Sequence, residues 1–211
     1  MYLGIDVGGT HTDAVIMDAG KVRVSCKKTT NHNDLLESVR AALSEVLADI
    51  PPSAVTRLNL STTLSTNAIV QGRIEDVGVL VSAGPGMDPE DFRIGPSYHV
   101  LHGSIDHRGH EILALDAAEL DQAANACRDM GIQAYAVATK FSTRNPAQEN
   151  QILDRIQDQA AVATLGHRLS GLLNFPRRVA TAYYNSAVWR IYNGFADAVE
   201  DAARELGLTA P

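Results

Sequence analysis

The chain has 211 residues, of which 45% are hydrophobic and 20% charged, and this composition excludes a disordered, collagenous or coiled-coil protein. Its formal net charge of -7 argues against a nucleic-acid backbone or an anionic membrane surface as the main partner. The two cysteines, Cys26 and Cys127, form no CxxC motif, so we expect reduced thiols and a cytoplasmic location. The N-terminal residues contain no basic segment and no long apolar run, so we expect neither a signal peptide nor a membrane span.

The first third of the chain predicts three strands, a helix, a fourth strand and a short helix. Apolar runs and polar–apolar alternation indicate the strands, and a Gly-Gly-Thr turn joins the first two. Apolar residues at helical spacing start at Asn33 or Asp34 and stop at the Pro51-Pro52 pair, which ends the helix. The predicted strands comprise residues 2–7, 12–17, 21–27 and 57–60, and the short helix lies around residues 66–70.

The rest of the chain predicts strands that alternate with helices, which is typical of a mixed α/β sheet. Residues 77–82 form a continuous apolar run, as expected for a strand buried on both faces. Asp116 and Glu119 form a capping box that begins a helix ending at Gly131. The other predicted elements are a hairpin of residues 100–105 and 111–115, a strand at 133–139, a helix that begins at Asn145-Pro146 and a helix at 182–206.

The segment Gly4–Asp13 carries the most informative motif, a hairpin whose turn is Gly8-Gly9-Thr10. A Walker A loop needs a lysine and a following helix, and a dinucleotide-binding fingerprint also runs from strand to helix, so neither fits a turn followed by a strand. Consecutive glycines let backbone N–H groups converge on a phosphate, and the hydroxyls of Thr10 and Thr12 add donors. The alternative is a tight hairpin without a ligand, and the acidic and hydroxyl residues around the turn favour phosphate binding.

Two carboxylates flank this turn. Asp6 lies near the end of the first strand, where it is placed to hold Mg²⁺ through water, because that ion keeps much of its hydration and takes few carboxylates. Asp13 is either a second carboxylate beside the metal, a group that positions an attacking water, or a cap of the turn. The sequence therefore predicts Asp6 and Asp13 as the catalytic carboxylates, with Asp6 as the metal ligand.

A second polar turn lies where the fourth strand ends and the short helix begins. Its candidate ligand-binding residues are Thr62, Thr63, Thr66 and Asn67. Serine and threonine at such a position often cap the helix and do nothing else. The functional alternative is that this turn faces the phosphate hairpin, as the ligand rule for open α/β sheets predicts.

The segment between residues 99 and 111 contains the densest group of histidines and acidic residues. The group consists of His99, His102, Asp106, His107, His110 and Glu111. Histidine and carboxylate side chains suit Zn²⁺ or Fe²⁺, but no pair has the spacing of two histidines on one helical face. The sequence therefore favours solvated or hydrogen-bonded histidines over a metal site.

Several segments resemble a known family. The stretch DVGGTHTD, residues 6–13, resembles the first phosphate motif of the actin-like ATPase superfamily and, more narrowly, the GIDVGGTFTD opening of the hydantoinase A/5-oxoprolinase family. Residues 61–68, 141–149 and 178–185 resemble three further segments of that family, in the same order and with similar spacing. The chain departs from the family at His11, where the family has Phe, and at Leu60-Ser61, where it has His-Gly.

This resemblance implies a fold and a domain organisation. It implies a ribonuclease-H-like, actin-like ATPase lobe with a mixed sheet and flanking helices over residues 1–180. Residues 181–211 would form a helix that leads into a second lobe, which the resemblance places outside this chain together with the adenosine pocket. The partners implied are that second lobe or a partner subunit, and the resemblance leaves room for a homo-oligomer.

The resemblance also implies an ATP-dependent hydrolase that opens a cyclic amide, of the hydantoin or 5-oxoproline type, by phosphorylating the amide oxygen. ATP and Mg²⁺ would be the cofactors, and the two polar turns would hold the phosphates. A chain limited to one lobe is expected to be inactive alone. The alternatives are an ATP-dependent ketone carboxylase subunit, a sugar-type kinase, for which no catalytic base in a GxGD context is found, and a non-catalytic nucleotide-binding subunit.

Overall fold

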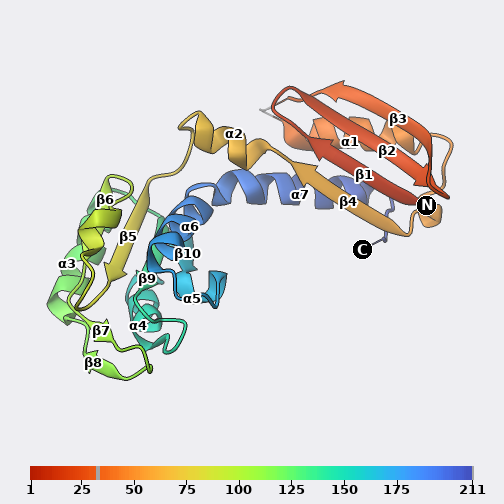
Figure 1. The fold of residues 1–211 in the computed structure, drawn as a ribbon. Coiled ribbons are helices and arrows are strands. Elements are labelled where there is room, and N and C mark those ends of the chain that lie inside the picture. The colour runs from red at the N-terminus through yellow and green to blue at the C-terminus, as the bar shows by residue number, and fades with distance from the viewer. Residues whose placement is uncertain (32–33, 211) are drawn as a thin grey trace. The chain divides into compact units, whose positions relative to one another are not determined.

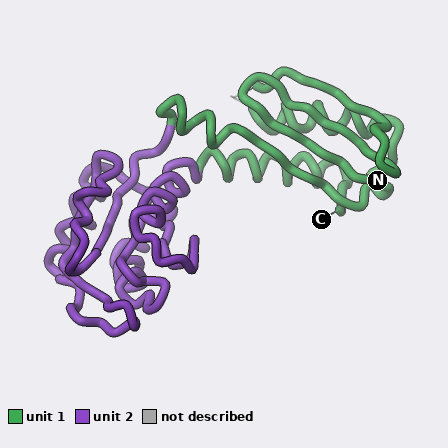
Figure 2. The backbone as a smooth tube through the Cα atoms, in the orientation of Figure 1, with its two compact units in different colours: residues 1–73, 190–211 green, residues 74–189 purple. Residues whose placement is uncertain are grey.

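The structure, a computed structural model, describes residues 1–31 and 34–210 (Figure 1). The chain passes from one compact unit into a second and then returns to the first. Unit 1 comprises residues 1–73 and 190–211, and unit 2 comprises residues 74–189 (Figure 2). Each unit has a sheet and helices of its own, and each is described by itself.

Unit 1 is built on a mixed four-stranded sheet with the strand order β3-β2-β1-β4. The strands β1 (Tyr2–Val7), β2 (His11–Asp18) and β3 (Lys21–Thr29) form an antiparallel meander. The strand β4 (Arg57–Thr62) follows a helical crossover and pairs with β1 in parallel. This arrangement places the turn between β1 and β2 beside the end of β4, because Val7 lies opposite both Thr12 and Thr62.

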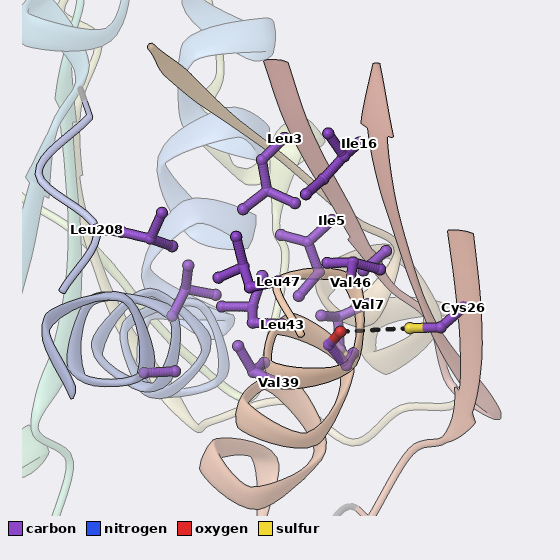
Figure 3. Close-up of a cluster of buried hydrophobic side chains, with 14 of the residues drawn as sticks. Leu3, Ile5, Val7, Ile16, Cys26, Val39, Leu43, Val46, Leu47 and Leu208 are labelled. Carbon is purple, nitrogen blue, oxygen red and sulfur yellow. Dashed lines mark hydrogen bonds between the residues drawn. The ribbon is translucent and has the colours of Figure 1, made fainter. Parts of the chain in front are cut away.

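Two helices, α1 (Leu35–Val46) and α7 (Trp189–Glu205), pack on one face of this sheet. Alternate residues of β1, namely Leu3, Ile5 and Val7, point to that face, and Figure 3 shows them beside the buried side chains of α1. The α7 residues that contribute to the same core are Phe195, Val199 and Ala202. Asp34, whose side chain accepts a hydrogen bond from the Glu37 amide at 2.9 Å, caps the start of α1. The other elements of unit 1 are a short 3-10 helix, Pro52–Ala54, and the helix α2 (Leu64–Val70).

Unit 2 has a parallel sheet with the strand order β10-β9-β5-β6. The strands are β5 (Val77–Ser82), β6 (Ser97–Val100), β9 (Ala134–Thr139) and β10 (Val162–Leu165). Every residue of the central strands β5 and β9 is buried, which explains their continuous apolar sequences. The remaining elements are the 3-10 helix Pro89–Phe92, the strands β7 (Ser104–Ile105) and β8 (Glu111–Leu113), and the helices α3 (Ala117–Asp129), α4 (Ala147–Ile156), α5 (Gly166–Leu169) and α6 (Phe175–Ala187).

Helices cover both faces of the second sheet. The helix α6 packs on one face, where Phe175 and Val179 join the alternate residues of β5 and β9. The helices α3 and α4 pack on the opposite face, where Leu120 and Ile152 meet Tyr135. No helix in the described part of the chain is long and apolar enough to cross a membrane.

The mixed α/β fold with flanking helices predicted from the sequence is confirmed. Instead of one sheet, the described residues form two four-stranded sheets and the two-stranded sheet β7-β8. Of the two larger sheets, only the first is mixed. The helix expected at residues 182–206 is interrupted at Val188, so it is divided between α6 and α7. The apolar spacing continues through Val188, which is why the sequence showed no break.

Three other boundaries differ from the predictions. The strand expected at residues 100–105 is divided, because β6 ends at Val100 and β7 begins at Ser104. The strand β10 was missed, and α6 begins earlier than expected, at Phe175, where Asn174 caps the helix by accepting from the Arg177 amide. Asn33, one of the two predicted starts of α1, lies outside the described residues. The expected domain boundary at residue 180 falls within α6 and stays a prediction.

Candidate phosphate-binding site

The hairpin between β1 and β2 closes through a hydrogen bond from the Gly8 amide to the His11 carbonyl at 2.9 Å. Gly8 and Gly9 are not among the glycines with a positive φ, so their contribution is space rather than an unusual backbone conformation. A Cβ at Gly9 would lie 3.2 Å from Nδ2 of Asn67, and a Cβ at Gly8 would lie 3.2 Å from the His11 carbonyl oxygen. Glycine therefore permits the close approach of the hairpin to α2.

A cavity of about 850 Å³ opens beside this hairpin. All of its walls come from unit 1, and they comprise the hairpin, the starts of α1 and α2, and the first turns of α7. The lining residues are Asp6, Gly8, Gly9, Thr10, His11, Asp13, Lys27, Leu35, Thr63, Leu64, Asn67, Ala68, Gln71, Arg73, Arg190, Ile191 and Gly194. A volume of this size is typical of small-molecule binding sites.

Three charged side chains of the cavity, Asp6, Asp13 and Lys27, come from the strands of the sheet. Asp6 and Asp13 lie opposite each other in the register of β1 and β2, so both carboxylates point away from the hydrophobic core. Lys27 on β3 lies opposite Asp13, and its ammonium group is 2.8 Å from that carboxylate. Arg73 and Arg190 line the same cavity. Two carboxylates beside three cationic side chains can bind a polyanion together with a divalent cation.

The second polar turn contributes only part of what was predicted. Thr63 and Asn67 line the cavity, and Nδ2 of Asn67 donates to Oγ1 of Thr63 at 3.3 Å. Thr62 lies outside the cavity lining, because its hydroxyl donates to the Val7 carbonyl at 2.7 Å and accepts from the Leu64 amide at 3.1 Å. Thr66 is exposed and also does not line the cavity. Thr62 therefore acts locally, as a link between the hairpin strand and α2.

The structure contradicts the prediction that the Thr12 hydroxyl donates to phosphate. It is fully buried, and its hydroxyl is 3.0 Å from the hydroxyl of Thr30. Side chains alternate along a strand, so the exposed position of Asp13 directs Thr12 to the core face. Thr10, by contrast, is exposed at the turn and lines the cavity.

Sequence reasoning missed the three cationic residues of the site. Lys27 could have been found by pairing the predicted strands, because the register that sets Asp13 outward also sets Lys27 outward. Arg73 and Arg190 come from positions far apart in the chain, and no motif surrounds them. Only the return of α7 to unit 1 brings Arg190 to the cavity.

The histidines and acidic residues between 99 and 111 do not converge. His102 is 2.6 Å from Glu119, and His110 is 3.4 Å from Asp106. The backbone amides of His110 and Arg108 hold the pKa of Asp106 below its ordinary value. Among the described residues, no three histidine, cysteine or acidic side chains are grouped as metal ligands.

Two of the other family-like segments meet in the interior of unit 2. Glu149 of the segment 141–149 is fully buried and lies 3.5 Å from the guanidinium group of Arg178, which begins the segment 178–185. The carboxylate of Glu149 also accepts from the Thr139 amide at 2.9 Å and from the His167 amide at 2.9 Å. These contacts join α4 and α6 to the carboxyl end of β9 and to α5.

Comparisons with known proteins point to one family. The family model described as the hydantoinase/oxoprolinase N-terminal region matches residues 2–160. Caprolactamase subunit alpha of Pseudomonas jessenii is 26% identical over 241 aligned positions, which cover 99% of this chain and 34% of that protein. The chain therefore spans about one third of the length of this curated relative.

Two solved structures have the same fold. The nucleotide-free structure of an acetone carboxylase, from work on ATP-dependent acetone carboxylation, has a TM-score of 0.84 at 17% identity. The match covers 98% of this chain and 34% of the acetone carboxylase chain. The ATP-dependent caprolactamase of Pseudomonas jessenii has a TM-score of 0.78 at 23% identity. The match covers 100% of this chain and 35% of the caprolactamase chain. Because the family model matches most of the chain, the protein belongs to the hydantoinase/oxoprolinase family, whose N-terminal region it carries.

Proposed function

We propose that this chain supplies the phosphate-binding part of an ATP-dependent hydrolase that opens a cyclic amide, such as a hydantoin, 5-oxoproline or a lactam. The observation that carries the proposal is the cavity of about 850 Å³, in which the Gly-Gly-Thr hairpin stands beside two carboxylates and three cationic side chains. Membership in the hydantoinase/oxoprolinase family and the ATP-dependent activity named for its caprolactamase relative support it.

In this proposal the backbone amides of the hairpin, Gly8 to Thr10, bind the terminal phosphates of ATP. Asp6 holds Mg²⁺, because it lines the cavity and Mg²⁺ is commonly bound by one or two carboxylates together with phosphate oxygens. Asp13 orients the attacking group, and Lys27 balances the charge of both Asp13 and the phosphate. Thr63 and Asn67, at the start of α2, line the part of the cavity that is proposed to hold the phosphates.

The reaction proceeds by transfer of a phosphoryl group. The amide oxygen of the substrate attacks the γ-phosphorus, the bond from that phosphorus to its bridging oxygen breaks, and ADP leaves with the electron pair. Water adds to the activated carbon, the ring carbon–nitrogen bond breaks, and the nitrogen leaves protonated as an amine. A second water hydrolyses the resulting acyl phosphate, so that 5-oxoproline or a lactam, ATP and two waters give an amino acid, ADP and phosphate. A hydantoin gives an N-carbamoyl amino acid instead, because its leaving nitrogen belongs to a ureido group.

We propose further that the enzyme is completed by a second lobe or a partner subunit. The relatives are about three times as long as this chain, which supports this proposal. Residues 1–180 would form the lobe that holds the phosphates, and residues 181–211 would lead towards the region that binds adenosine. The chain alone would then bind the phosphates of ATP weakly and would not turn over a cyclic amide.

The phosphate site is tested by titrating the chain with Mg-triphosphate and with Mg-ATP, observed by ¹H–¹⁵N NMR. We expect shifts at the hairpin amides, and we expect Gly9→Val to abolish them, because a side chain there would collide with Asn67. Gly171→Val is the matched control, because nothing among the described residues lies within 4 Å of a Cβ at that glycine. Equal binding by Gly9→Val would contradict the proposal, and tight binding of Mg-ATP would contradict the incomplete site.

A further inference from the structure

The cavity beside the hairpin has a second, apolar side. Leu64 and Ala68 come from α2, Ile191 from α7, and Leu35 from the start of α1. Leu35, Leu64 and Ile191 also pack on the hydrophobic core of unit 1, and Ala68 is buried, so the fold fixes their positions. The cavity therefore joins a polar wall that suits phosphate to an apolar wall that suits a hydrocarbon group.

Gly194 is the most informative residue of the apolar side. It lies inside α7 with an ordinary helical φ, and an added Cβ would meet nothing within 4 Å among the described residues. Glycine is a poorer helix former than every residue except proline, and neither close packing nor backbone conformation requires it here. What Gly194 does is leave open space at the wall of the cavity.

We propose that the apolar side of this cavity, at Leu35, Leu64, Ala68, Ile191 and Gly194, binds the ring of the cyclic amide substrate. This inference rests on the proposed function and adds the place where the substrate binds. Phosphoryl transfer requires the acceptor oxygen within about 3 to 3.5 Å of the phosphorus, so the acceptor must share a cavity with the phosphate hairpin.

The chemistry of the two walls also fixes the orientation of the substrate. The methylene groups of a lactam ring contact the apolar side, while its amide oxygen points to the hairpin. A hexose would turn several hydroxyl groups against leucine and isoleucine and leave them without hydrogen-bond partners, which is unfavourable. The apolar wall therefore selects a ring with few polar groups.

The proposal is tested with a volume series at residue 194. Gly194→Ala and Gly194→Leu both improve the helix, so we expect the melting temperature of the chain to rise by about 2 to 4 °C. The ligand probe is ε-caprolactam, titrated in the millimolar range with and without Mg-triphosphate and observed by NMR at the amides of Ile191 and Gly194. We expect Gly194→Leu to weaken caprolactam binding about tenfold or more, because overfilling a cavity excludes its ligand.

Asn193→Leu is the matched control, because Asn193 is exposed on the same helix and does not line the cavity. We expect this variant to bind caprolactam as the unchanged chain does. Equal caprolactam binding by Gly194→Leu and the unchanged chain would overturn the proposal. So would adenosine shifting the same amides while caprolactam shifts none, because the apolar wall would then be a nucleoside site.

The triphosphate titration separates this inference from the proposed function. If Mg-triphosphate shifts the hairpin amides and caprolactam leaves the α7 amides unchanged, the substrate site is wrong and the phosphate site stands. If Mg-triphosphate shifts no hairpin amide, the proposed function fails whatever caprolactam does. We expect Gly194→Leu to bind Mg-triphosphate within about twofold of the unchanged chain, because the polar wall does not include α7 residue 194.

Discussion

Lys27 reaches the carboxylate of Asp13 on the neighbouring strand, and the side chains are 61% and 43% exposed. An ion pair at this exposure contributes at most about 1 kcal/mol to folding, because solvent screens it and both side chains lose rotamer freedom. The same ammonium group faces the cavity in which phosphate is proposed to bind. Its main contribution is therefore to the charge of the site and not to the stability of the sheet.

The first prediction concerns the change Lys27→Met. We expect the dissociation constant for Mg-triphosphate to rise about fivefold to tenfold, and the free energy of unfolding to fall by about 1 kcal/mol or less. Calorimetric titration and urea denaturation measure the two quantities. Lys28→Met serves as the control, because Lys28 pairs with Glu45 and does not line the cavity. A similar loss of binding in Lys28→Met would show that only net charge matters.

The second prediction concerns the buried pair Glu149 and Arg178. Each is almost completely shielded from water, and burial lowers the pKa of Arg178 from its ordinary value. Arg178→Met leaves the Glu149 carboxylate buried without this partner, so we expect the free energy of unfolding to fall by about 3 to 5 kcal/mol. Thermal denaturation measures the loss. Arg177→Met, at the exposed neighbouring position, is expected to change the stability little, and an equal loss there would contradict the assignment.

The third prediction concerns pH. Burial, and then the charge of Arg93, lower the pKa of His99 below its ordinary value of 6.5. The unfolded chain therefore binds a proton at His99 more readily than the folded chain does. The neutral His99 side chain therefore contributes to stability above pH 6.5, and this contribution is lost as the pH falls towards the pKa of His99 in the folded chain. We expect His99→Gln to reduce the dependence of stability on pH between 6.5 and 5, measured by urea denaturation. An unchanged slope would rule out His99 as its source.

At the scale of single elements, the local sequence predicted the starts of helices best. The side chain of Asp116 accepts hydrogen bonds from the amides of Ala118 at 2.8 Å and Glu119 at 3.2 Å, so the predicted N-cap is confirmed. The capping box is not closed, because the Asp116 amide donates to the His102 carbonyl and the Glu119 carboxylate accepts from the His102 amide. The sequence also predicted most strand positions, because apolar and polar residues alternate along a strand that is buried on one face. It failed where no local signal exists, as in the break at Val188, where α6 stops and α7 starts without a glycine or proline.

The fourth prediction tests the cap of α3. We expect Asp116→Ala to lower the free energy of unfolding by about 1 kcal/mol, because two backbone amides lose their acceptor. Asp129→Ala, in the last turn of the same helix, should leave stability unchanged or raise it slightly, since an acidic residue there opposes the helix dipole. Thermal denaturation of both variants distinguishes a cap from a general effect of removing charge.

At the scale of the whole molecule, the candidate site was predicted in part. The residues Gly8, Gly9 and Thr10 and the carboxylates Asp6 and Asp13 follow one another in the sequence, so a local motif was enough to find them. The far walls come from residues that only tertiary packing brings to the hairpin, among them the two arginines and α7. The division into two units was also not predicted, because unit 1 combines residues 1–73 with residues 190–211, which lie far apart in the chain.

The fifth prediction follows from this division. Residues 74–189 are continuous in the chain and contain a complete parallel sheet with helices on both faces. We expect this segment, produced alone, to fold cooperatively, with dispersed NMR resonances and a single thermal transition. Residues 1–73 alone should lack these signs, because Phe195, Val199 and Ala202 of α7 are missing from their core. A well-folded 1–73 fragment would contradict this dependence.

The place of α7 in the first core has a consequence for the order of events during synthesis. The strands of unit 1 leave the ribosome before unit 2, but their last packing partner, α7, emerges after all of unit 2. Unit 2 can complete its core while the N-terminal sheet still has an uncovered apolar surface. The apolar surface of the first sheet is thus uncovered for longest while residues 74–189 are translated. Chaperone binding during that interval should centre on β1 to β3.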